Sequence, residues 1–557
     1  MMRGLIVCWW LVAGLLGAGN VPAATAPQAA IASAHPLATA AGEALLAQGG
    51  NACDAAVAVA AALAVVEPYS SGLGGGGFFL LHRAADQQQV MIDARETAPS
   101  GIRRHHFFDA DGRLIEGAST RGGTAAAIPG LPAGLAHLTQ RCGTLSLAQA
   151  LAPAIRLARD GFEVDQRYLR IVRLREAMLR GSAETALFLD DGRAPAPGFV
   201  LRQPDLALTL QGIARAGAAE GFYRGSVAQA LVATVNAAGG AWQMADLAAY
   251  RVVEREPVRI TYRGATITAA ALPSAGGIAL AQVLGMLEHY APGDAHDPET
   301  AHLVVESLRR AFRDRAQLGD PDHVAVPVAE LIKKDKLKQY VTEMRRERAT
   351  PLEPPVAAAA GIGSSNTTHF SIIDQAGNRV AATLTINLLF GAGLVGRGTG
   401  VLLNNEMDDF TLRADLANSF QLRGGAANAV APGKRPLSSM TPTFVEDDKG
   451  VLILGAPGGS RIISQVLLVA LEYLRRPQVD LQQLVALPRY HHQYWPDRIE
   501  IEPEGFSAAW RNALQAKGHQ LHIVNRKWGN LQVVFQSRVT GVAQAASDPR
   551  GSDVAWY

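Results

Sequence analysis

The spacing of apolar residues predicts helices at the start of the chain, followed by a hairpin. Residues 36–66 predict two helices separated by Gly49-Gly50-Asn51. The second helix, from Asp54 to Val66, is apolar on nearly every face, which is typical of a buried helix. Residues 77–94 then predict a β-hairpin that turns at 86–88, because two runs rich in apolar residues flank a polar segment.

The later chain changes from helices to strands. Helical spacing dominates residues 130–340, for example at 147–158 and 301–318, with strand-like stretches at 258–262 and 265–269. Residues 349–365, rich in Ala, Pro and Gly, are typical of a flexible linker. Further predicted elements are strands at 368–374, 379–386, 401–404, 451–454, 498–502 and 531–536, and a helix at 462–475. This order favours sheets packed between helical layers.

Composition narrows the class of protein. The 557 residues carry a net charge of +2, so no strong field exists to recruit nucleic acid or anionic lipid. The cysteines Cys8, Cys53 and Cys142 are too few for a disulfide framework or a metal cluster, and their pairing stays open.

The first residues are typical of a secretory signal. Arg3 precedes an apolar stretch at residues 4–18, and Val21-Pro22-Ala23 fits a cleavage site for small residues. A single-pass anchor is the alternative, but the apolar stretch is short for a membrane span. We therefore expect a signal peptide at residues 1–23 and an exported protein, periplasmic or extracellular, without a membrane anchor.

Two motifs that suggest cofactors have the wrong context. The run Gly72-Leu-Gly-Gly-Gly-Gly77 matches G-x-G-x-x-G, but a dinucleotide site needs a strand before it and a helix after it. The predicted order here is the reverse, which favours a loop of close backbone approach. The pairs His105-His106 and His491-His492 lack the spacing of metal ligands. We expect neither a metal nor an organic cofactor.

The segment Ser364-Ser-Asn-Thr-Thr-His369 carries the strongest local signal for chemistry. A linker runs directly into Thr367 at the start of a strand. The Thr367 hydroxyl could attack the carbonyl of Asn366, and hydrolysis of the ester would free the Thr367 α-amine. That amine would then serve as the base for its own hydroxyl. A polar turn before a strand is the alternative interpretation.

Three further segments could complete a site. Gly455-Ala-Pro-Gly-Gly-Ser-Arg461 joins a predicted strand to a helix, where exposed N–H groups can hold an oxyanion or simply form a tight turn. Residues 434–443 supply hydroxyls, and residues 404–409 supply carboxylates at a predicted strand end. A cation, hydroxyls and a carboxylate suit an α-amino acid, although Asp408-Asp409 is equally compatible with a helix cap.

The chain from about His35 to the C-terminus resembles the γ-glutamyltranspeptidase family. The resemblance rests on ordered motifs, which are His35-Pro-Leu-Ala, Gly49-Gly-Asn-Ala-Cys-Asp, Leu73-Gly-Gly-Gly-Gly-Phe, Asp93-Ala-Arg-Glu-Thr-Ala-Pro, Thr367-Thr-His, Leu402-Leu-Asn-Asn-Glu-Met-Asp-Asp-Phe, Arg435-Pro-Leu-Ser-Ser-Met, Pro457-Gly-Gly-Ser-Arg and Ala546-Ser-Asp-Pro-Arg.

The resemblance implies an α+β fold, a four-layer αββα sandwich of the N-terminal-nucleophile hydrolase type. Cleavage between Asn366 and Thr367 would give two intertwined subunits, a large one of residues 24–366 and a small one of residues 367–557, which together build one catalytic domain.

The resemblance also implies a role for each site residue. Thr367 is the implied nucleophile, Thr385 supports it, and Gly458 and Gly459 form the oxyanion hole. Arg95, with Ser438 and Ser439, would grip the α-carboxylate of the γ-glutamyl group. The implied acceptors around its α-amino group are Asn387, Glu406 and Asp409. Phe420 stands at the aromatic lid position, often Tyr in the family, so the lid loses a hydroxyl hydrogen bond.

The implied activity is γ-glutamyl transfer and glutathione hydrolysis through a threonyl ester. Water or an amino acid or dipeptide acceptor would receive the group. Retention of Asp409 favours γ-glutamyl substrates over those of glutaryl or cephalosporin-type acylases on the same scaffold, because the substrate ammonium keeps an anionic partner. A catalytically silent, exported protein that binds γ-glutamyl peptides is the alternative from another class.

Overall fold

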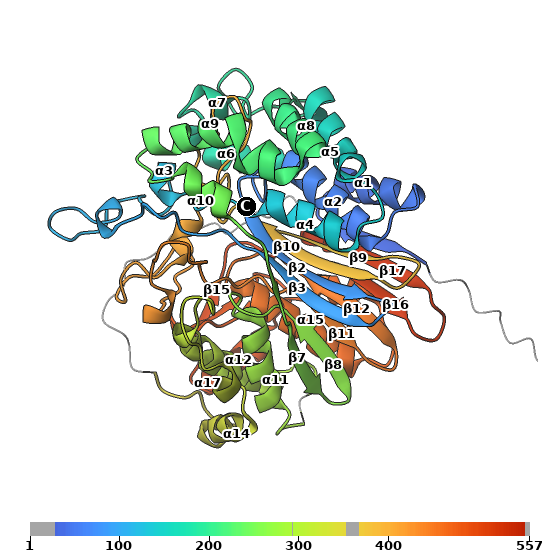
Figure 1. The fold of residues 1–557 in the computed structure, drawn as a ribbon. Helices are drawn as coiled ribbons and strands as arrows, with labels where there is room; N and C mark the ends of the chain where they lie inside the picture. The colour runs from blue at the N-terminus through green and yellow to red at the C-terminus, as the bar shows by residue number, and fades with distance from the viewer. Residues whose placement is uncertain (1–27, 292, 353–366, 552–557) are drawn as a thin grey trace, which may run out of the picture.

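Two sheets and two groups of helices form the body of the molecule. The computed structural model describes residues 28–291, 293–352 and 367–551. In this part, two six-stranded sheets face each other between the helix groups (Figure 1). The predicted signal at residues 1–23, residues 353–365 of the predicted linker, and Asn366 lie outside the described residues.

The first sheet combines strands from distant parts of the chain and is antiparallel throughout. Its order is β1 (Ala30–Ser33), β9 (Thr368–Ile373), β10 (Arg379–Thr385), β2 (Gly76–Arg83), β3 (Gln88–Ala94) and β6 (Val253–Arg255). Strands β9 and β10, which follow Thr367, therefore lie between strands from the beginning of the chain. The predicted hairpins β2–β3 and β9–β10 are confirmed.

The second sheet is also antiparallel and mixes early and late strands. Its order is β17 (Ala543–Ser547), β16 (Gln532–Ser537), β12 (Gly450–Gly455), β11 (Thr443–Glu446), β8 (Ala265–Ala269) and β7 (Val258–Tyr262). The stretches predicted at 258–262 and 265–269 form β7 and β8 at those bounds.

Alternation along β2 explains why the first sheet is apolar on both faces. Successive side chains of a strand point to opposite faces. Phe79 and Leu81 pack in the core shared with the first helix group, whereas Phe78 and Leu80 pack in the core shared with the second sheet. A strand buried on both sides reads as a continuous apolar run, as β2 does.

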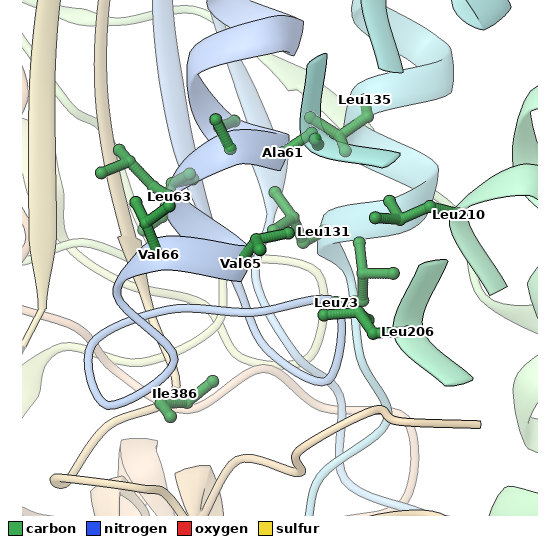
Figure 2. Packing of buried hydrophobic residues seen from close by; sticks show 14 of the residues in the cluster. Ala61, Leu63, Val65, Val66, Leu73, Leu131, Leu135, Leu206, Leu210 and Ile386 are labelled. Atoms are coloured by element: carbon green, nitrogen blue, oxygen red, sulfur yellow. The ribbon is translucent and has the colours of Figure 1, made fainter. Parts of the chain in front are cut away.

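The first helix group is built around a fully buried helix. Helix α1 (Pro36–Ala47) precedes α2 (Ala52–Val66), and every residue of α2 is buried, as predicted. Asn51 and Asp54 form a capping box that starts α2. In Figure 2, leucines of α4 (Leu131–Cys142) and α8 (Pro204–Ala218) lie beside the α2 side chains.

The second helix group covers the other sheet. It contains α11 (Gly276–Leu287), α12 (Pro298–Asp314) and α15 (Arg461–Arg475), all of which share a core with β8 and β12.

The remaining described helices of at least six residues, from both groups, are α5 (Leu147–Asp160), α6 (Gln166–Leu179), α9 (Gly225–Ala237), α10 (Met244–Ala249), α14 (Lys334–Glu343), α16 (Leu481–Ala486) and α17 (Ala508–Ala516). A small sheet joins β13 (Tyr490–His491), β14 (Ile499–Ile501) and β15 (Leu521–Ile523).

The strand predicted at residues 401–404 is wrong. Leu402 and Leu403 make only isolated bridges, to Val395 and Gly74. The Asn404 side chain bonds the backbone of Gly74 and of Ala127, and the chain then turns into the short 3₁₀ segment η4 (Glu406–Asp409). The carboxylates of this segment therefore lie on a turn and not at a strand end.

A disulfide joins Cys53 at the start of α2 to Cys142 at the end of α4, with Cα atoms 5.9 Å apart. This settles the pairing that the sequence left open.

Among the described residues, no helix is long and apolar enough to cross a membrane.

Replacing Cys53 and Cys142 together by serine is expected to lower the thermal unfolding midpoint. The bond closes a sequence separation of 89 residues, and such links contribute about 2–4 kcal/mol. In the wild type, iodoacetamide should modify neither cysteine after unfolding without reductant, and both after reduction. Modification of either before reduction would contradict the pairing.

Candidate active site

The hydroxyl of Thr367 faces a second threonine hydroxyl. Thr367 is buried directly before β9, and its Oγ1 lies 3.3 Å from Oγ1 of Thr385 at the end of β10. Their proximity follows from the hairpin register, in which Leu384 pairs with Thr368. Thr385 Oγ1 also accepts the N–H of Asn387 at 2.8 Å, so this hydroxyl is held in place.

The glycine run before β2 lets other backbone segments approach this point. A Cβ on Gly75 would lie 2.0 Å from the carbonyl oxygen of Thr385, and one on Gly74 would lie 2.0 Å from that of Leu402. Only glycine fits where the backbones are this close. The predicted loop of close approach is confirmed.

Thr368 ties the strand after Thr367 to the first helix group. Its hydroxyl donates to Oε2 of Glu67, at 2.8 Å. Glu67 follows the last residue of α2, is fully buried, and also accepts from Arg167 at 2.7 Å. This contact between a charged pair and β9 fixes the strand on the side away from the second sheet.

Arg95 is the centre of a buried ion cluster. It follows β3, and its Nη2 donates to Oδ2 of Asp409 at 2.7 Å while Nη1 donates to Oε1 of Glu406. Nη1 also lies 3.5 Å from a carboxylate oxygen of Glu96. The Nε donates to the Pro436 carbonyl at 3.2 Å. One guanidinium therefore meets several carboxyl groups in a site away from water.

Burial shapes the protonation of this cluster. It raises the pKa of Glu96 to about 7 and raises the pKa of Glu406 above its usual range, against the opposing charge of Arg95. Burial also opposes the charge of Arg95, but the carboxylates raise the pKa of its guanidinium further. The cluster therefore takes up a proton near neutral pH while Arg95 stays charged.

Two serines and an asparagine present further polar groups. Ser438 Oγ accepts the N–H of Met440 at 3.1 Å, and the Ser438 N–H donates to the Pro273 carbonyl at 2.8 Å. Ser439 follows and is also buried. Asn387, at φ 72°, donates its Nδ2 to the Asn405 carbonyl at 2.9 Å.

The glycine turn connects β12 to α15, as predicted. Gly458 and Gly459 have φ values of 137° and 58°, which favour glycine. The Pro457 carbonyl accepts from Gln465 Nε2 at 2.9 Å, which holds the turn against α15. A Cβ on Gly459 would lie 2.7 Å from the ring of Phe420, so the aromatic ring covers this turn directly.

Phe420 is connected to the ion cluster through one side chain. Its N–H donates to Oδ1 of Asn418 at 3.0 Å, while the Asn418 Nδ2 donates to Oδ1 of Asp409 at 3.1 Å. The position of the ring is therefore linked to the carboxylate at the other side of the pocket.

One pocket unites these side chains. It contains about 310 Å³ of space not filled by atoms, its mouth included. The predicted residues that line it are Arg95, Thr367, Thr385, Asn387, Glu406, Asp409, Phe420, Ser438, Ser439 and Gly459. Gly458 lies next to this lining and not in it. Two roomier hollows, beside Arg475 and beside His137, do not include Thr367.

The sequence interpretation missed four residues of the lining, which are Arg315, Leu422, Met440 and Ile462. Arg315 lies in the 3₁₀ segment η3 (Arg315–Gln317) after α12. Its segment contains several other arginines, so the sequence offers no signal that separates Arg315 from them.

One group of described residues has the spacing of metal ligands. Ligand atoms of Asp294, His296 and Glu472 lie within 4.8 Å of one another. However, Glu472 already accepts from the guanidinium groups of Arg475 at 2.7 Å and Arg476 at 3.1 Å. These cations neutralise the carboxylate and disfavour a metal ion there.

The family model and the most similar curated proteins point to the same family. Residues 38–557 match the family described as Gamma-glutamyltranspeptidase. The Glutathione hydrolase proenzyme of Pseudomonas sp. (strain A14) is 39% identical over 88% of this chain and 86% of its own length. The Glutathione hydrolase proenzyme of Escherichia coli (strain K12) is 38% identical over 95% of this chain and 91% of its own length.

A solved structure extends the likeness to the fold. The cephalosporin acylase from Bacillus halodurans superposes with a TM-score of 0.82 at 27% identity, covering 94% of each chain. The mixed α/β fold is therefore that of a known enzyme scaffold. With nearly its whole length matched, this chain belongs to the gamma-glutamyltranspeptidase family.

Proposed function

We propose that the protein is a γ-glutamyltransferase and glutathione hydrolase that uses Thr367 as its nucleophile. The observation that carries the proposal is the shared pocket of Thr367 and the Arg95–Asp409 ion pair. After cleavage, the Thr367 hydroxyl would act as the nucleophile and the freed α-amine of the same residue as its base. The ion cluster supplies opposite charges for the two charged groups of an α-amino acid.

Self-cleavage comes first in this proposal. Thr367 attacks the carbonyl of Asn366, and hydrolysis leaves chains of residues 24–366 and 367–557. The products stay together in a four-layer sandwich of the N-terminal-nucleophile hydrolase type. The contact of Thr367 Oγ1 with Thr385 Oγ1 supports this step, because a hydroxyl partner can orient the attacking oxygen.

Acyl transfer then uses the same hydroxyl. Thr367 Oγ1 attacks the γ-amide carbonyl of glutathione or a related compound, and the free α-amine accepts the proton. The N–H groups of Gly458 and Gly459 hold the oxyanion, each contributing about 2.7–4 kcal/mol at comparable sites. Cysteinylglycine leaves, and water or an amino acid or dipeptide takes the γ-glutamyl group from the threonyl ester.

The ion cluster recognises the α-amino acid end of the donor. Arg95 with Ser438 and Ser439 binds the α-carboxylate, while Asp409, Glu406 and Asn387 accept from the α-ammonium. Phe420 covers the bound donor from the side of the glycine turn, which its ring already contacts.

An acylase activity is the second candidate, favoured by the likeness in fold to the cephalosporin acylase. Such donors have no α-ammonium, so Asp409 would face no cation of the donor. The presence of the Asp409 carboxylate in the pocket lining, where a donor ammonium would find an anionic partner, supports the γ-glutamyl function instead. Export also belongs to this proposal, since the Cys53–Cys142 disulfide suits an oxidising compartment and the sequence predicts a signal peptide.

Thr367→Ala is expected to abolish both self-cleavage and turnover, because alanine has no hydroxyl to form the ester. Denaturing mass spectrometry of the purified variant should give one uncut chain, while the wild type gives a chain that begins at Thr367. Thr367→Ser is the matched control, since it keeps a hydroxyl and should still cut itself. A cut Thr367→Ala protein would exclude Thr367 as the nucleophile, and an uncut wild type that binds γ-glutamyl peptides would favour the silent binding protein.

Asp409→Asn is expected to reduce kcat/KM for γ-glutamyl-p-nitroanilide about tenfold to a hundredfold, because the α-ammonium loses a charged hydrogen bond. For glutaryl-p-nitroanilide, which lacks the α-amino group, the variant should change kcat/KM little.

Asp408→Asn is the control for this prediction. The Asp408 carboxylate accepts from Ser119 at 2.8 Å and from the Ser419 N–H at 2.9 Å, and it does not line the pocket of Thr367. This variant should leave the preference between the two donors unchanged. Equal losses on both donors in Asp409→Asn would contradict the assignment of Asp409 to the ammonium.

A further inference from the structure

Arg315 is a buried guanidinium with no hydrogen-bond or ion-pair partner among the described residues. Its side chain makes no hydrogen bond, ion pair or ring contact there, and its Nε is fully shielded. The other arginines of the same segment are paired. Arg309 and Arg310 both bond Glu306, and Arg313 lies 3.6 Å from Asp314.

The position of Arg315 is fixed by close packing of its own turn. A Cβ on Gly425 would lie 2.3 Å from the carbonyl oxygen of Ala316, the residue after Arg315. The backbone of η3 is therefore pressed against the 424–428 segment. The side chain enters the pocket of Thr367 and also borders the adjoining hollow beneath residues 410–424.

Burial makes this arrangement costly. It lowers the pKa of Arg315 to about 10, with Asp409 acting in the opposite direction and Arg95 adding to the lowering, so the group stays cationic at neutral pH. A buried N–H group without an acceptor also costs free energy, because it has lost its hydrogen bonds to water. A native protein that keeps such a group calls for a partner that binds it.

The charge around Arg95 indicates what that partner is. Both terminal nitrogens of Arg95 already donate, to Glu406 and to Asp409. A donor carboxylate that relied on Arg95 alone would approach one cation surrounded by carboxyl groups. Arg315 is a second cation within the field of Asp409 and Arg95, and it offers unused N–H groups to the same pocket.

We propose that Arg315 binds the α-carboxylate of the donor directly, as a second guanidinium beside Arg95. This inference rests on the proposed γ-glutamyl function and adds a residue to its recognition. The two arginines together make a free α-carboxylate a requirement for the donor, because an amide there leaves the buried N–H groups of Arg315 without an anionic acceptor.

The test compares Arg315→Met and the wild type on two donors. One is γ-glutamyl-p-nitroanilide, and the other is the same compound with its α-carboxylate converted to a carboxamide. The variant should lose about tenfold to a hundredfold in kcat/KM on the carboxylate donor and less than about threefold on the carboxamide. Arg313→Met, in the same segment but half exposed, is the matched control and should change neither value.

Two outcomes would overturn the proposal. Equal losses on both donors would mean that Arg315 only supports the fold of the pocket. Glutaryl-p-nitroanilide, which lacks the α-amino group, serves as a third donor. A loss that persists with the carboxamide but disappears with glutaryl-p-nitroanilide would mean that Arg315 acts through Asp409. Denaturing mass spectrometry checks that each variant has cut itself and thus folded.

A second variant and a binding measurement cover the remaining cases. If Arg315→Met does not fold, Arg315→Lys replaces it, and a loss confined to the carboxylate donor is again expected because a point charge lacks the planar fork. Titration calorimetry compares the binding of L-glutamate with the binding of its α-amide, in the wild type and in the variant. The difference in affinity measures recognition of the α-carboxylate without turnover. Wild type that binds L-glutamate but turns over no γ-glutamyl donor would contradict the proposed function alone, whereas unchanged selectivity for the carboxylate in the variant would contradict the role of Arg315.

Discussion

Strand β9 sets the position of Thr367, and the geometry of the pocket depends on it. The strand is buried along its whole length and pairs on both edges, with β1 and with β10. Thr368 adds a hydrogen bond to Glu67 on one face, and the ring of His369 packs over Gly455 of β12 on the other. A residue placed one position before such a strand has little freedom, which is what a reaction at its own hydroxyl requires.

Burial is the main cause of the raised pKa values of the carboxyl groups in the ion cluster. Arg95 contacts three carboxyl groups, so burial and mutual repulsion keep a proton in the cluster near neutral pH. A zwitterionic ligand brings one charge of each sign and leaves this balance unchanged. In the proposed function, the ammonium of an α-amino acid meets the carboxylates of this cluster, and its carboxylate meets Arg95 and Arg315.

The sequence predicted the elements whose pattern is local. The buried helix α2, the hairpins β2–β3 and β9–β10, and the helix α15 follow from apolar spacing and turn residues. Strands β1 and β17 were not predicted, because the stretches Ala30–Ser33 and Ala543–Ser547 consist mainly of small residues and lack an apolar alternation. The pairing of β9 with β1 could not be read from sequence either, since it joins segments more than 300 residues apart.

The residues of the site also divide into those that the sequence could predict and those that it could not. Thr367, the glycine turn and the carboxylates lie in motifs that can be recognised locally, and the pocket brings together all the residues that the family resemblance implied except Gly458. Residues 401–404 were wrong as a strand because the Asn404 side chain replaces the ladder bonds with bonds to Gly74 and Ala127. Arg315 was missed because its distinction is the lack of a hydrogen-bond or ion-pair partner among the described residues, and only three-dimensional packing reveals that property.

The strand order also determines what self-cleavage would do to the molecule. Strands β9 and β10 follow the proposed cut, yet they lie between β1 and β2, which precede it. In the second sheet, β11 from after the cut pairs with β8 from before it. Two chains made in this way cannot separate without breaking both sheets. The new α-amine of Thr367 would therefore remain at the buried end of β9, beside Thr385, in the geometry that the intact chain already holds.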